Sequence, residues 1–87
     1  MTMSETAIRD TIRGHILENL MFTDDAAKLP DDASLLDMGV IDSTGVLELV
    51  LLIEENFSMQ VLDTAIVPEN FDSVDRIVSY VMRAKAA

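Results

Sequence analysis

Apolar residues recur at every fourth position near the start of the chain, which is the spacing of one face of a helix. The pattern predicts a helix from about Glu5 to Leu20. Either Ser4 or Thr6 can cap this helix, because a hydroxyl before the first turn accepts hydrogen bonds from free backbone N–H groups. The residues expected to face the core are Ile8, Ile12, Ile16 and Leu20.

A second and stronger pattern predicts a helix from Ser43 to about Phe57. Asp42 or Ser43 can cap it, and a carboxylate at this end also suits the helix dipole. At about 100° per residue, apolar side chains gather on one face and polar ones on the opposite face. The apolar face contains Val46, Leu49, Val50, Ile53 and Phe57, and the polar face contains Thr44, Glu48 and Glu55.

Leu47 and Leu51 fall between these two faces, nearer to the acidic side. In one interpretation they flank the core. In the other they form a docking patch, where leucines supply contact area and the neighbouring acids supply orientation and faster association.

The remaining segments predict one long connection and two shorter helical elements. Residues 23–41 are too rich in Asp, Pro and Gly for a long helix, so we expect a loop that apolar side chains pin to the core. Residues 63–70 should form one short helical turn whose length Pro68 limits, and a last helix should begin at Asp72 or Ser73. The loop anchors are Leu29, Leu35, Leu36 and Met38, and the inner stripe of the last helix is Val74, Ile77, Val78 and Val81.

These elements predict an all-α fold: a small four-helix bundle, with three main helices, one short helix and a long loop between the first two main helices. With 87 residues the chain should form a single domain over residues 1–87. A core of this size leaves little room for an enclosed active-site pocket.

The charge of the chain is strongly one-sided, with 16 acidic and 6 basic residues. From Leu29 through Asp75, with both ends included, there are eleven carboxylates and no Lys or Arg. Such a field repels nucleic acid and attracts basic proteins, which excludes a nucleic-acid partner and favours a basic protein partner. An acidic surface that serves solubility alone is the alternative.

The amino-acid composition also indicates in which cellular compartment the protein is expected. The chain has no cysteine, which excludes disulfides and thiolate metal sites. Its longest apolar run, Leu49–Ile53, is far too short to span a membrane, and Met1–Arg9 lacks the apolar centre of a signal peptide. We therefore expect a soluble, cytoplasmic monomer with no membrane partner.

The candidate for chemistry is the hydroxyl of Ser43, where a turn becomes a helix. A serine nucleophile needs a base, and the single histidine, His15, falls on the apolar face of the first helix. The nearest glycines, Gly39 and Gly45, do not form a G-x-S-x-G elbow. Ser43 is thus suited to be modified by a partner enzyme, although it could also be a simple helix cap.

The spacing of the carboxylates does not match that of a known metal site. Asp24-Asp25 and Asp31-Asp32 are adjacent pairs, not the alternating spacing of a calcium loop. We expect no defined metal site, only weak binding of divalent cations to the acidic surface.

Several stretches of the sequence together resemble a known family. They are Leu35–Gly39, Asp42-Ser43, Glu48–Val50, Ile53–Phe57 and Phe71–Val74, the last followed by Ile77 and Tyr80-Val81. In this order, over almost the whole chain, they resemble the acyl and peptidyl carrier proteins that bear 4′-phosphopantetheine.

This resemblance implies a carrier that is not itself an enzyme. Ser43 would receive 4′-phosphopantetheine from coenzyme A through a phosphopantetheinyl transferase, and the thiol of the arm would hold an acyl or aminoacyl group as a thioester. An acyl- or aminoacyl-activating ligase would load the carrier, and downstream enzymes would take the group on. The residues implied in docking these partners are Asp42, Thr44, Leu47, Glu48, Leu51, Glu54 and Glu55.

The residues after the serine depart from the fatty-acid carriers, which typically have Leu and then an acid where this chain has Thr44-Gly45. A small or polar residue followed by Gly is more similar to D-alanyl carriers and to stand-alone carriers served by ligases. The segment from Asp63 to Phe71 is also slightly longer, which could reshape the groove that receives the cargo. This favours a specialised biosynthetic pathway; the alternative is an acidic helical adaptor that binds a basic protein and is never modified.

Overall fold

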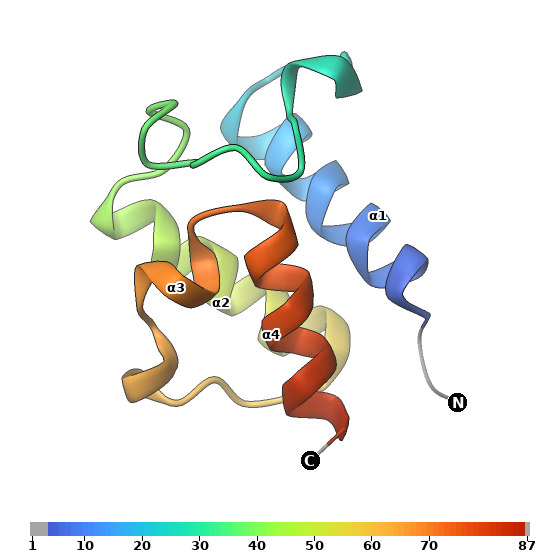
Figure 1. Cartoon of the computed structure of the whole chain (residues 1–87), viewed down its shortest axis with the longest axis vertical. Helices are drawn as coiled ribbons and strands as arrows, with labels where there is room; N and C mark the ends of the chain where they lie inside the picture. The colour runs from blue at the N-terminus through green and yellow to red at the C-terminus, as the bar shows by residue number, and fades with distance from the viewer. Residues whose placement is uncertain (1–3, 87) are drawn as a thin grey trace.

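The computed structural model describes residues 4–86, apart from the side chains of Ser43 and Ala86. Within this range the chain is helical and contains no strand, and the helices pack around one core, which confirms the predicted all-α bundle (Figure 1). In chain order the elements are α1 (Glu5–His15), η1 (Ile16–Leu20), η2 (Ala26–Lys28), α2 (Ser43–Phe57), η3 (Asp63–Ala65), α3 (Pro68–Phe71) and α4 (Val74–Ala86). None of these helices has the length and apolar character needed to cross a lipid bilayer.

The core consists of the predicted helix faces together with anchors from the loops. The inward stripe of α4 is buried as predicted, and so is that of α1 and η1 except Leu20, which is half-buried. In α2 the predicted stripe is buried except Val46, which is half-buried, and Leu52 is buried as well. Aliphatic side chains make up most of this core, and Phe57 and Phe71 are its largest members. The fully buried hydrophobic residues are Ile8, Ile12, Ile16, Leu29, Leu35, Leu49, Ile53, Phe57, Phe71, Val74, Ile77, Val78 and Val81.

Side-chain caps determine where the three main helices begin. Ser4 Oγ accepts from the N–H of Ala7 at 3.1 Å, so Ser4 rather than Thr6 caps α1. Ser73 Oγ accepts from the N–H of Arg76 at 3.1 Å, and α4 therefore begins at Val74, just after both predicted starts. Hydroxyls and carboxylates at these positions replace the backbone partners that a first turn lacks.

The first helical segment has the predicted length, but its last turn is wider than an α-helix. The N–H of Met21 donates to the carbonyl of Ile16 at 2.9 Å, which makes η1 a π-helical turn. η1 ends at Leu20, and Met21 caps it. Phe22 follows with a left-handed φ of 54°, and its side chain is 83% exposed.

Two expectations about the connections were wrong. Residues 63–70 contain two helical turns instead of one, because Pro68 begins the second: its fixed φ and missing N–H suit the first position of α3. Leu29 and Leu35 are buried anchors as predicted, but Leu36 and Met38 are 41% and 40% exposed. Leu36 follows Leu35 directly and points to the opposite side of the loop, where it meets a surface cleft.

Two arginines of α1 hold the long loop in place. Arg9 pairs with Asp31 at 3.0 Å and with Asp75 at 2.6 Å, and so connects α1, the loop and α4. The hydrogen bond to Asp75 is the main reason why the pKa of Arg9 is raised. Arg13 pairs with Asp31 and also donates to the carbonyls of Leu29 and Ala26. We call these contacts the arginine clamp.

The arrangement of the helices separates the ends of the chain from the start of α2. In Figure 1 the start of α1 and the end of α4 lie toward the same, lower right side of the molecule. Helix α2 begins at the opposite, left side.

Candidate functional site

The candidate site is built around the first turn of α2. Asp42 Oδ1 accepts from the N–H groups of Thr44 and Gly45 at 3.0 and 2.8 Å, so Asp42 caps the helix. Ser43 is the first residue of α2, and its side chain lies outside the described part of the structure. The exposed side chains of Asp42 and Thr44 on either side of it indicate that this helix start is open to solvent.

The chain approaches this helix through a tight turn. The N–H of Gly39 donates to the carbonyl of Leu36, and the N–H of Val40 donates to that of Leu35. Gly39 has a φ of +71°, a conformation that costs a residue with a side chain roughly 1–2 kcal/mol. Buried Ile41 then fixes the end of the turn against the core.

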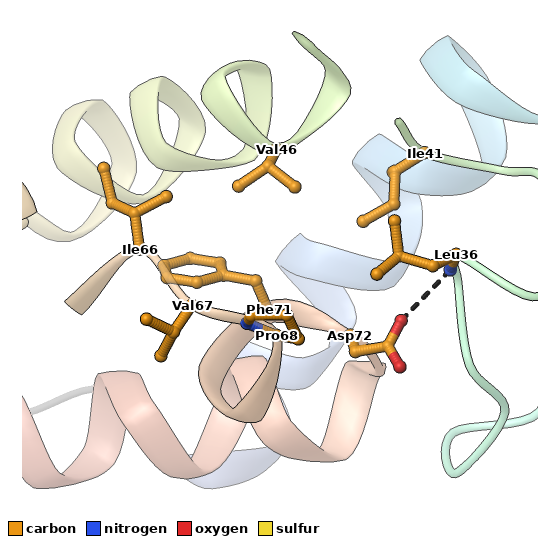
Figure 2. Close-up of a pocket in the computed structure, with 8 residues that line it drawn as sticks. All are labelled: Leu36, Ile41, Val46, Ile66, Val67, Pro68, Phe71 and Asp72. Atoms are coloured by element: carbon orange, nitrogen blue, oxygen red, sulfur yellow. Dashed lines mark hydrogen bonds between the residues drawn. The ribbon is translucent and has the colours of Figure 1, made fainter. Parts of the chain in front are cut away.

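An apolar cleft opens beside the first turn of α2 and has a volume of about 290 Å³. In Figure 2, α2 contributes the upper wall and the segment around α3 the lower wall, with the loop before α2 at one end. Ile41 and Val46, which bracket Ser43 in the sequence, both line it. We call this the apolar cleft; its lining is Leu36, Ile41, Val46, Ile66, Val67, Pro68, Phe71 and Asp72.

A second hollow, of similar volume, also lies against the first turns of α2. Gly45 lines it, and a Cβ added at this position would lie 3.3 Å from the Cβ of Ile41. The missing side chain therefore allows the turn before α2 to pack closely against the helix. The full lining is Leu20, Gly39, Val40, Ile41, Asp42, Thr44, Gly45 and Glu48.

The outer face of α2 combines exposed leucines with carboxylates. Leu47 and Leu51 are 53% and 57% exposed, so they face solvent and do not flank the core. Glu48 and Glu55 are exposed on the same helix. Glu54 differs, because its carboxylate accepts from the N–H of Val61 at 3.0 Å and is only partly exposed. One of the expected docking acids thus also holds the loop after α2.

The structure does not bring the histidine to the candidate site. His15 lies on α1 and lines neither of the two hollows beside α2. Its Nδ1 is 3.5 Å from the side-chain amide of Asn19, and its buried Nε2 has no hydrogen-bond partner within residues 4–86. Of the adjacent acidic pairs, Asp31 is engaged in the arginine clamp, and no cluster of three potential metal ligands occurs in residues 4–86.

Sequence reasoning located the helix start, but it expected a cargo groove near Asp63–Phe71 only from the family resemblance and did not predict the residues that line the apolar cleft. The cleft draws on three separate segments, so no single periodic pattern reveals it. The only available signal was the apolar run Ile66-Val67-Pro68 with Phe71, in a segment otherwise rich in polar residues.

Comparison with known proteins gives a consistent set of relatives, although no protein-family model matches the chain. An acyl carrier protein of Zymomonas mobilis is 36% identical over 84 residues, which are 97% of this chain and 100% of that protein. An acyl carrier protein of Akkermansia muciniphila is 31% identical over 83 residues, covering 95% and 99% of the two chains. A D-alanyl carrier protein of Streptococcus suis is 32% identical over 75 residues, covering 86% and 91%.

Proposed function

The chain belongs to the family of acyl and D-alanyl carrier proteins, and we propose that Ser43 is the residue through which it carries its cargo. The observation that supports this best is the Asp42-Ser43 pair at the start of α2, with Asp42 as the cap and Ser43 as the first helical residue. Because Asp42 accepts from the N–H groups of Thr44 and Gly45, the start of α2 does not need Ser43 as its cap. A hydroxyl in an exposed first turn is accessible to a modifying enzyme.

The group attached to Ser43 is, in this proposal, 4′-phosphopantetheine from coenzyme A. A phosphopantetheinyl transferase forms the bond from Ser43 Oγ to the phosphate, and the bond from this phosphate to the nucleotide part of coenzyme A breaks. The residues present fit such a group, because a negative charge is favoured at a helix N-terminus and the apolar cleft lies beside it. When bound, the arm supplies a thiol that holds an acyl or aminoacyl group as a thioester.

The chain itself acts as a substrate of partner enzymes and not as a catalyst. His15 lines neither of the two hollows beside α2, so the transferase supplies the base that removes the proton of Ser43. The chain contributes a fixed helix start, a docking face and an apolar wall for the cargo. We assign these tasks to residues 1–87 as one carrier domain, a monomer that works in the cytoplasm.

Partner enzymes dock, in this proposal, on the outer face of α2. Leu47 and Leu51 offer exposed apolar area, and Glu48 and Glu55 surround it with negative charge. This combination fits a partner with apolar contacts inside a basic rim. Asp42 and Thr44 extend this face to the modification site. Glu54 sits at its edge, because its carboxylate is bonded to the loop after α2.

Reversing one charge of this face should slow docking. We expect Glu48→Lys to reduce kcat/KM of the phosphopantetheinyl transferase several-fold at low salt, with a weaker dependence on ionic strength. The measurement is the rate of modification against salt concentration, followed by intact-protein mass. Glu69→Lys is the matched control, because Glu69 is exposed on α3, outside α2. Equal rates for the two variants at low salt would remove α2 from the docking surface.

The cargo is proposed to come from an acyl- or aminoacyl-activating ligase in a specialised biosynthetic pathway, and downstream enzymes then receive it. Two features support this. Thr44-Gly45 follow the serine, and Gly45 allows the close packing of the turn against Ile41. D-alanyl carrier proteins also occur among the relatives of this chain, beside acyl carrier proteins.

The direct test is the intact mass of the protein before and after incubation with coenzyme A, magnesium and a broad-specificity phosphopantetheinyl transferase. We expect a gain of one phosphopantetheine, which peptide mapping locates at Ser43. If a folded sample gains no mass, the carrier proposal fails for this chain. The acidic face of α2 would then belong to an unmodified adaptor that binds a basic protein.

A further inference from the structure

Phe22 is the most exposed of the large apolar residues within residues 4–86. It is 83% exposed, against 53% and 57% for Leu47 and Leu51 on the outer face of α2. An aromatic ring left in water gives up the favourable burial that Phe57 and Phe71 have in the core. Packing within this chain therefore gives no reason for an aromatic residue at this position.

The backbone at Phe22 also favours a different residue. The N–H of Thr23 donates to the carbonyl of Leu17 at 2.9 Å, and Phe22 takes the left-handed conformation where this bond closes the helix end. Glycine usually occupies such a position, because a side chain is strained there. A bulky residue in this conformation is rare, and strain of this kind is typical of functional sites. Phe22 is thus kept against both burial and backbone geometry.

The surroundings of Phe22 have the same character as the outer face of α2. Glu18, Asp24 and Asp25 are exposed close to it in the chain. An apolar side chain bordered by carboxylates fits a protein surface that has an apolar pocket and a basic rim. The same carboxylates oppose contact with an anionic membrane or with a second copy of this acidic chain.

The second hollow connects the segment around Phe22 with the outer face of α2. Leu20, two residues before Phe22, lines this hollow together with Glu48 of α2. Leu51 lies one turn after Glu48, on the same face of the helix. Figure 1 shows the light-blue end of the first helical segment beside the green loop that leads into α2. An enzyme docked on α2 therefore has Phe22 within reach.

We infer that Phe22 is a second anchor for the phosphopantetheinyl transferase that docks on α2. The inference rests on the proposed function, because it assigns a further contact to the same partner. The ring of Phe22 enters an apolar pocket of the transferase, while Leu47 and Leu51 make contacts along α2. A few anchors of this kind carry most of the energy of an interface. Phe22 does not touch the reacting atoms, so it contributes to binding and not to the chemical step.

The test compares the wild type with Phe22→Ala, Phe22→Gly and Leu62→Ala. Each protein is incubated with coenzyme A, magnesium and a broad-specificity phosphopantetheinyl transferase, and intact-protein mass gives kcat and KM for the carrier. Thermal melting by circular dichroism gives the Tm of each variant. Leu62→Ala is the matched control, because Leu62 is 66% exposed but lies in the loop that follows the far end of α2.

Phe22→Ala should raise KM for the carrier about tenfold and leave kcat unchanged, because the lost contact is equal in the ground state and the transition state. Phe22→Gly should raise KM at least as much. Its Tm should equal or exceed that of the wild type, because glycine relieves the strained backbone. Weaker binding without lower stability separates a docking role from a structural one. Leu62→Ala should leave both kcat and KM unchanged.

Failure of this inference and failure of the proposed function give different results. If the wild type gains no mass, the proposed function fails and the inference fails with it. If the wild type is modified but Phe22→Ala keeps its KM, or Leu62→Ala raises KM equally, the anchor role is refuted and the proposed function stands. A Tm of Phe22→Gly well below that of the wild type would make the ring structural. An unchanged KM, with dimerisation or binding to phosphatidylcholine vesicles lost in Phe22→Ala, would assign the ring to a second copy or to a lipid surface instead.

Discussion

Ser43→Ala is expected to remain folded and to gain no mass when it is incubated with coenzyme A and a phosphopantetheinyl transferase. Attachment requires the hydroxyl, so the loss should be complete. The fold should hardly respond, because Asp42 supplies the hydrogen bonds to Thr44 and Gly45 that cap α2. We expect the free energy of unfolding to change by less than about 0.5 kcal/mol.

The matched control for this variant is Asp42→Ala. It keeps the hydroxyl but loses the cap, and should lower the free energy of unfolding by about 0.5–2 kcal/mol. Intact-protein mass and thermal melting by circular dichroism measure both effects. A mass gain in Ser43→Ala would place the modification elsewhere. Melting of Ser43→Ala well below Asp42→Ala would make the serine chiefly structural.

The second large effect is expected from Arg13→Ala, which removes half of the arginine clamp. The variant loses the ion pair with Asp31 and the hydrogen bonds to two loop carbonyls. The side chain is 18% exposed, so solvent only partly replaces these contacts. We expect a loss of about 1–3 kcal/mol in the free energy of unfolding, and about 4–8 °C in Tm for each kcal/mol in a domain of this size.

Two further substitutions decide whether the cause is geometry or charge. Arg13→Lys should recover only part of the stability, because an ammonium group cannot reproduce the fork of donors that reaches Asp31 and both carbonyls. Lys28→Ala removes a positive charge from an exposed side chain of the same loop and should change Tm little. If Lys28→Ala and Arg13→Ala were equally destabilised, the clamp would matter only through net charge.

Local patterns were sufficient to predict the three main helices and most of their buried faces. The four-residue spacing of Ile8, Ile12 and Ile16 and the apolar face of α2 each depend on periodicity alone. The same angular argument placed Leu47 and Leu51 between the two faces and left two interpretations open, and the structure shows both side chains in solvent. Each helix cap was predicted only as a choice between two candidate residues. The sequence offers two side-chain acceptors close together at each helix start, and only the folded geometry decides which one binds the backbone N–H groups.

Contacts between distant segments could not be predicted from such patterns. Arg9 and Asp75 are far apart in the sequence, and no periodic signal pairs them. The same holds for Glu54, whose bond to Val61 depends on how the loop after α2 returns. The apolar cleft is a further example, since Leu36 and Asp72 lie 36 residues apart in the sequence and meet only in the folded chain.

The separation between the chain ends and the start of α2 has a practical consequence. Because α1 starts and α4 ends on the side of the molecule away from the first turn of α2, a tag or fused domain at either end leaves this turn uncovered (Figure 1). The protein can thus be immobilised on a sensor surface by either end while enzymes approach α2 from solution. It can also be joined to a partner enzyme by a flexible linker. The linker raises the effective concentration of the carrier at the active site of that enzyme.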